Sequence, residues 1–203
     1  IPSVTELGYL SPGNLSVSDT GLCFPFSSSF GLPFEFPCFG TGDMREPAFH
    51  AVYKNGSRIT CFEYESYRLI DGKPQLNGLP ATYADDKEVQ TLEIKLRDKV
   101  TGLVANLLYS VFEKRNVITR SVRLENCGED SIVIQKAASM SVDFYDSDFK
   151  VTNLHGDWAR EMRAEEMSFA GGKYVIESTT GFSSNRQNPF FIISEPYAGE
   201  TAG

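Results

Sequence analysis

Short runs in which apolar and polar residues alternate follow one another along most of the chain. The clearest is TLEIKLRD at residues 91–98, where leucine or isoleucine at every second position alternates with a charged residue. Successive side chains of a β-strand point to opposite faces, so this run predicts a strand with one buried and one polar face. Further strands are expected in the runs 48–54, 58–70, 102–114, 116–126, 131–145, 173–180 and 188–194.

Turn-forming residues separate these runs at near-regular spacing. Asn55-Gly56 lies between the runs 48–54 and 58–70, and because both residue types tolerate positive φ, it predicts a tight hairpin there. A second cluster of turn formers lies at 126–130. No long segment has the 3.6-residue period of an amphipathic helix. The pattern therefore predicts an all-β, antiparallel sandwich rather than a parallel α/β sheet.

Two segments depart from the strand pattern. Residues 157–167, DWAREMRAEEM, are rich in helix formers, and Trp158 and Met162 stand four positions apart, so a helix is an alternative there. Residues 1–33 are dense in Pro, Gly, Ser and Phe, which predicts an irregular N-terminal segment of the same domain. Since no interior linker or repeat is visible, residues 34–203 are expected to form a single sandwich domain.

Charge and hydropathy exclude two classes of partner. The 203 residues include 19 Lys and Arg against 27 Asp and Glu, which gives a formal net charge of -8. No block of basic residues is available to follow a phosphate backbone, so we expect no nucleic acid partner. No apolar run approaches the roughly 20 residues needed to span a bilayer, and the first residues lack the layout of a signal peptide. We therefore expect no membrane association.

The four cysteines, Cys23, Cys38, Cys61 and Cys127, form no CxxC pair and have no histidine at zinc-ligand spacing. They lie in apolar or strand-like runs, where a reduced cysteine behaves as a small hydrophobic residue. The sequence therefore predicts four free thiols, no metal site, no cofactor and a cytoplasmic location.

No pattern typical of a catalytic site appears. His50 and His155 lie far apart in the sequence and outside any nucleophile or zinc motif. The GFSSN segment at 181–185 lacks the GxSxG frame, and the acidic run at 143–148 lacks the glycine and terminal glutamate of a calcium loop. Each of these features is expected to be structural or a solvated surface group.

Several longer motifs, in a fixed order, carry a resemblance to a known family. They are EFPCFGTGDMREPAF (35–49), GKPQLNGLPATYADD (72–86), NVITRSVRLENCGEDSIVIQKAASMSVDF (116–144), LHGDWARE (154–161) and GFSSNRQNPFFIIS (181–194). Together they resemble the amino-terminal domain of the bacterial α-galactosidases of glycoside hydrolase family thirty-six, the melibiase family. The resemblance implies an antiparallel β-supersandwich with a galactose-mutarotase-like fold, and it identifies the Asp43-x-Arg45-x-Pro47 turn as a family signature.

The resemblance also implies that the catalytic residues lie elsewhere. In that family the domain precedes a (β/α)₈ barrel, which supplies the nucleophile and the acid/base carboxylate and needs roughly 200 residues of its own. Retaining hydrolysis needs two carboxyl groups about 5 Å apart, and no such pair is assigned here. We therefore expect that the chain alone does not hydrolyse α-galactosides such as raffinose or melibiose, and that the parent enzyme does.

Substrate contacts from this domain are implied by the same resemblance. Family members form homo-oligomers, dimers or tetramers, in which the sandwich of one subunit lies over the active-site mouth of another. Trp158, the single tryptophan of the chain, is expected to stack on the sugar, and its alternative is a place in the sandwich core. Asp43 and Arg45 are candidates for hydrogen bonds to sugar hydroxyls, and their alternative is a local pair that fixes the turn. A further Asp of the family, upstream of that turn, has no recognisable counterpart.

Two other functions remain open from the sequence. A stand-alone carbohydrate-binding module would suit the fold, although a single tryptophan supports it poorly. A mutarotase-like enzyme would need a general acid and base over the anomeric carbon, usually a His and a Glu. The sequence alone does not bring His50 or His155 to a glutamate.

Overall fold

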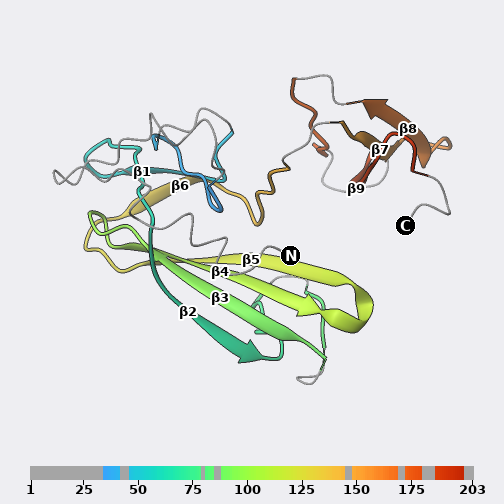
Figure 1. The fold of residues 1–203 in the computed structure, drawn as a ribbon. Coiled ribbons are helices and arrows are strands. Elements are labelled where there is room, and N and C mark those ends of the chain that lie inside the picture. The colour runs from blue at the N-terminus through green and yellow to red at the C-terminus, as the bar shows by residue number, and fades with distance from the viewer. Residues whose placement is uncertain are drawn as a thin grey trace. The chain divides into compact units, whose positions relative to one another are not determined.

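A computed structural model describes residues 34–41, 46–78, 81–84, 88–144, 148–168, 172–179 and 186–198. These residues form nine strands and no α-helix, and every pairing between named strands is antiparallel. The all-β, antiparallel prediction is confirmed. The chain divides into two compact units between Val142 and Asp143, and each is described by itself (Figure 1).

The larger unit contains a four-stranded sheet. It follows the order β2-β3-β4-β5, and it is drawn in green to yellow in Figure 1. A 3₁₀ turn at Glu113–Arg115 joins the last two strands. The strands are β2 (Glu63–Asp71), β3 (Gln90–Arg97), β4 (Leu103–Phe112) and β5 (Val117–Asn126).

The alternating pattern of residues 91–98 has the predicted effect on this sheet. Ile94 and Leu96 of β3 pack against the hydrophobic core, and Leu107 lies opposite Ile94 on β4. Glu93 and Lys95 point to the other face, which is polar. The period of two residues therefore gave both the strand and the identity of its two faces.

A two-stranded sheet completes the larger unit. Strand β1 (Phe49–Tyr53) pairs with β6 (Ile132–Ala137). The core that the two sheets share consists of Phe36, Cys38, Ala48, Phe49, Ala51, Tyr53, Leu103, Ala105 and Leu107.

The structure contains the turn predicted at Asn55-Gly56 but not the hairpin. The turn forms, since the Gly56 amide donates to the Tyr53 carbonyl at 2.8 Å and Gly56 has φ 81°. The strands on either side do not pair with each other, however. Strand β1 joins β6 and strand β2 joins β3, because residues 58–62 carry the chain from one sheet to the other.

The smaller unit is a three-stranded sheet in the order β8-β7-β9. Its strands are β7 (Lys150–His155), β8 (Arg163–Ser168) and β9 (Gln187–Ser194). The helix alternative for residues 157–167 is wrong, because the second half of that segment is β8 and pairs with β7. The strand predicted at 188–194 is present, whereas the described part of 173–180 is irregular.

Two other sequence predictions concern thiols and membranes. Cys38 is a buried free thiol and Cys127 is an exposed one, while Cys23 lies outside the described residues. Burial raises the pKa of the Cys38 thiol to about 12, with smaller contributions from nearby Cys61 and Asp98. Among the residues that the structure describes, none belongs to a helix long and apolar enough to cross a bilayer.

Candidate functional site

Trp158 lies in the loop that joins β7 to β8. Its side chain is 85% exposed, so the alternative of a sandwich-core tryptophan is wrong within the unit that contains it. Asp43 and Arg45, the other two candidates for sugar contacts, lie outside the described residues. The structure therefore bears on one of the three predicted site residues.

Backbone contacts hold the Trp158 loop. The Gly156 amide donates to the Arg186 carbonyl, and the Arg160 amide donates to the Asp157 carbonyl, both at 2.9 Å. A Cβ on residue 156 would lie 2.3 Å from the Arg160 carbonyl oxygen, so only glycine fits there. The loop is thus shaped by its main chain, and the indole ring is left in solvent.

Two residues of the loop have unusual backbone conformations. Ala159 and Met162 have φ values of 61° and 59°, in the left-handed region that residues with a Cβ rarely adopt. The Ala159 amide donates a hydrogen bond to Oε1 of the Glu161 carboxylate at 2.9 Å. Such strain persists where the surrounding structure imposes it and is frequent at ligand-binding loops.

A polar pocket of about 470 Å³ lies at the base of this loop. His155, the last residue of β7, contributes to it three positions before Trp158, and Arg186 contributes from beside Gly156. The remaining lining includes Glu165, Tyr174, Glu177 and Gln187. Carboxylates, a guanidinium, an amide and a phenol offer both donors and acceptors to a ligand with several hydroxyl groups.

A histidine and a glutamate meet in this pocket, which the sequence did not reveal. His155 Nδ1 lies 3.3 Å from Glu165 Oε2, although the two groups are not aligned for a hydrogen bond and Nδ1 is buried without one. Antiparallel pairing places His155 opposite Arg163, and Glu165 follows two positions later on the same face. The pairing register of β7 and β8 was the missing information.

Within the part of the chain that the structure describes, His50 does not form such a pair with a glutamate. The ring of His50 stacks on Phe39 with centroids 4.4 Å apart, and its Nε2 is buried without a hydrogen-bond partner. Among the described residues, no group of three or more His, Cys, Asp or Glu side chains is arranged to hold a metal ion.

A buried amide supports the pocket from inside the sheet. Asn153 of β7 donates from Nδ2 to the Phe190 carbonyl at 2.8 Å and to the Asn188 carbonyl at 3.4 Å. These carbonyls flank Pro189, which has no amide hydrogen and so cannot donate a hydrogen bond to a neighbouring strand. The side chain therefore ties β7 to β9 near a register shift between Asn153 and His155.

Comparison with protein families gives a match along most of the chain. The family model described as the glycosyl hydrolase family 36 N-terminal domain matches residues 13–203, and the match includes residues of both units. Alpha-galactosidase AgaA of Geobacillus stearothermophilus is 44% identical over 170 residues, which cover 83% of this chain and 23% of that protein. Alpha-galactosidase 2 of Hypocrea jecorina is 42% identical over 169 residues, with coverage of 83% and 23%.

Solved structures agree with this match. The crystal structure of AgaA aligns with a TM-score of 0.79 at 44% identity, over 82% of this chain and 23% of that chain. The crystal structure of AgaB from the same organism aligns with a TM-score of 0.83 at 41% identity, over 90% and 25%. A variant of AgaA was solved in complex with raffinose. The chain thus spans about a quarter of the length of these relatives, and its sandwich class agrees with theirs.

Proposed function

The chain belongs to the N-terminal domain family of glycoside hydrolase family 36, and from this premise we propose that it is the non-catalytic N-terminal domain of a longer α-galactosidase. The parent enzyme would hydrolyse terminal α-galactosyl residues of oligosaccharides related to raffinose and melibiose. Support comes from α-galactosidase relatives about 40% identical along four-fifths of this chain. The matched region is under a quarter of their length, so the catalytic carboxylates would lie in the remainder.

The observation that carries a role at the substrate is the exposed Trp158 on a loop fixed by its backbone. An indole face stacks on the C–H face of a galactosyl ring, and such contacts gain from water exclusion. The polar pocket beside the loop would add hydrogen bonds to sugar hydroxyls. In this proposal Asp43 and Arg45 keep the same assignment, as contacts at the rim of the substrate site.

The proposal includes contacts of this domain with the rest of the parent chain and with a second subunit. Strand β9 carries four consecutive large apolar residues that are 37% to 54% exposed: Phe190, Phe191, Ile192 and Ile193. Consecutive residues face both sides of a strand, so apolar side chains lie on both faces of this one. A strand of this composition is typical of a sheet covered on both faces. Contacts with the rest of the parent chain and with a second subunit, in a dimer or tetramer, would supply that cover.

The meeting of His155 and Glu165 gives the mutarotase-like alternative one supporting observation. A mutarotase needs an acid and a base that reach the ring oxygen and the anomeric hydroxyl separately. Here the two groups contact each other, which favours a structural pair at the base of the loop. The second alternative, a stand-alone carbohydrate-binding module, would require binding without the parent enzyme.

The test is kinetics of the parent enzyme with Trp158→Ala. Loss of a stacking contact of about 0.5–1.5 kcal/mol should lower kcat/KM for raffinose about two- to tenfold. Tyr197→Ala is the matched control, because Tyr197 is a 97% exposed aromatic of the same unit outside the loop. Equal kcat/KM in both variants and in the wild type would remove Trp158 from the substrate site.

A further inference from the structure

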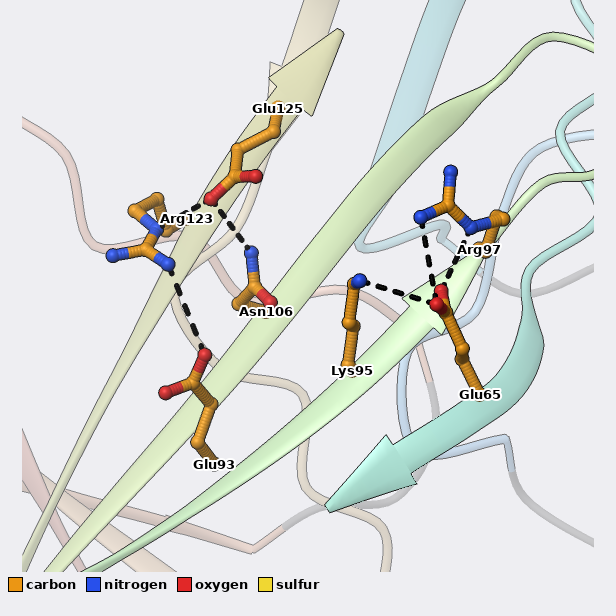
Figure 2. Close-up of polar contacts among 7 residues, drawn as sticks. All are labelled: Glu65, Glu93, Lys95, Arg97, Asn106, Arg123 and Glu125. Atoms are coloured by element: carbon orange, nitrogen blue, oxygen red, sulfur yellow. Dashed lines mark hydrogen bonds and ion pairs between the residues drawn. The ribbon is translucent and has the colours of Figure 1, made fainter. Parts of the chain in front are cut away.

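The polar face of the four-stranded sheet carries a second cleft, far along the chain from the Trp158 loop. It has a volume of about 300 Å³, and four strands contribute to it. It is lined by Ser66, Tyr67, Arg68, Glu93, Lys95, Asn106, Arg123 and Glu125. Figure 2 shows Glu93, Asn106, Arg123 and Glu125 pointing toward one another, whereas Lys95 pairs with Glu65 at 3.1 Å.

Glu93 is the buried centre of the cleft. Its side chain is 7% exposed, and Arg68 contacts its Oε2 at 2.7 Å. Arg123 lies 3.8 Å from its other oxygen, Oε1. A carboxylate buried to this degree is costly unless it is paired, so the two guanidinium groups are held in place by Glu93 while their outer N–H groups face solvent.

The opposite wall repeats this arrangement. Arg123 Nε donates to Glu125 Oε1 at 2.9 Å, and Asn106 Nδ2 donates to the same oxygen at 3.1 Å (Figure 2). Both contacts fall on one oxygen, so the second oxygen of Glu125 can accept from a ligand. Arg123 is 58% exposed and uses only part of its five donors. Acceptors and donors therefore alternate along the cleft.

Charge balance in the cleft restricts the ligand. Arg68 and Arg123 carry positive charge and Glu93 and Glu125 carry negative charge, while the charge of Lys95 is paired with Glu65. An anion would meet the carboxylates and a metal cation would meet the guanidinium groups. A neutral molecule whose hydroxyl groups both donate and accept suits alternating charges, because each hydroxyl can bridge a carboxylate and a cation.

We propose that this cleft is a saccharide-binding site distinct from the Trp158 loop. The cleft is at the lower end of the range of ligand pockets, about 300–1,000 Å³, so it suits a single pyranose ring. The choice of a sugar among neutral polyols rests on the galactoside function proposed above. The site would hold one unit of an oligosaccharide through Arg68, Asn106, Arg123 and Glu125.

The experiment is a titration of the ¹⁵N-labelled chain with galactose and with raffinose, followed by NMR. In the wild type, the Asn106 side-chain amide and the Arg123 Nε–H signals should shift on addition of sugar. The titration is repeated in Trp158→Ala, where binding at the cleft should persist. Sodium phosphate is the comparison ligand, and it should not shift the same signals.

Arg123→Gln tests the cleft directly. Loss of a charge-assisted hydrogen bond should weaken sugar binding about tenfold or more. Lys99→Gln is the matched control, because Lys99 pairs with Glu63 at 2.5 Å outside the cleft. The affinity of this variant for the sugar should equal that of the wild type. Arg68→Gln gives a second variant if Arg123→Gln proves unstable.

The outcomes separate this inference from the proposed function. No shift of the cleft signals with either sugar, equal affinity in Arg123→Gln, or loss of all binding in Trp158→Ala would each overturn the inference. Shifts with phosphate alone would identify an anion site and would overturn it too. Cleft binding together with unchanged kinetics of Trp158→Ala would leave the inference standing and reject the proposed role of Trp158.

Discussion

The four-stranded sheet of the larger unit and the three-stranded sheet of the smaller unit are stabilised in different ways. Strand β4 in the larger unit is buried along nearly its whole length, and its neighbours cover it with apolar side chains. Strands β8 and β9 in the smaller unit are exposed at most positions. The four-stranded sheet packs on a core that it shares with β1 and β6, whereas the described part of the three-stranded sheet buries little apolar surface and leaves large apolar side chains exposed. This difference separates the part that folds on itself from the part suited to contact other surfaces.

The largest effect should come from emptying the core of the first sheet. Leu107→Ala removes a fully buried side chain and should cost about 2–5 kcal/mol of unfolding free energy. Ile192→Ala on β9 removes a side chain that is more than half exposed and should change it by about 0.5 kcal/mol or less. Urea unfolding of both variants measures the contrast. Similar losses would mean that β9 is as well packed as β4.

A smaller effect is expected from the hydrogen bonds of the second sheet. Asn153→Ala leaves the Asn188 and Phe190 carbonyls without their donor and should cost about 1–3 kcal/mol. Hydrogen exchange should quicken in β7 and β9 and stay unchanged in β3 and β4. Thr152→Ala, at the preceding residue of β7, is the control. Faster exchange in β3 and β4 would show that the two sheets unfold together.

The same contrast explains which features the sequence could predict. The period of two residues identified β3, which has one apolar and one polar face. Strand β4 was expected from its apolar run between turn formers, since it is buried along most of its length and has no polar face. Turn chemistry located the turn at Asn55-Gly56, but the partner of β1 is β6, about eighty residues further on. The residues of a turn determine its local geometry, but they do not determine which distant strand pairs with the strand that precedes the turn.

The candidate site was predictable to a similar degree. Trp158 was found through its motif, and its exposure follows from a loop whose shape depends on Gly156. The pocket beside it was missed, because His155 and Glu165 meet only through the register of two strands and a seven-residue loop. The helix propensity of residues 157–167 was overridden by pairing of β8 with β7, since tertiary pairing outweighs a preference of a few tenths of a kcal/mol per residue.

The smallest effect on stability should come from the residue that matters most to the proposed function. Trp158 contributes little to packing in the chain, so Trp158→Ala should change the unfolding free energy by about 0.5 kcal/mol or less. Gly156→Ala should destabilise more, because the added Cβ would meet the Arg160 carbonyl oxygen at 2.3 Å and the loop would have to move. Thermal melts of the two variants beside the wild type give the comparison. A fall in Tm for Trp158→Ala as large as that for Leu107→Ala would show that the indole is packed in solution. The contrast between the four-stranded sheet and the exposed three-stranded sheet would then not hold at this loop.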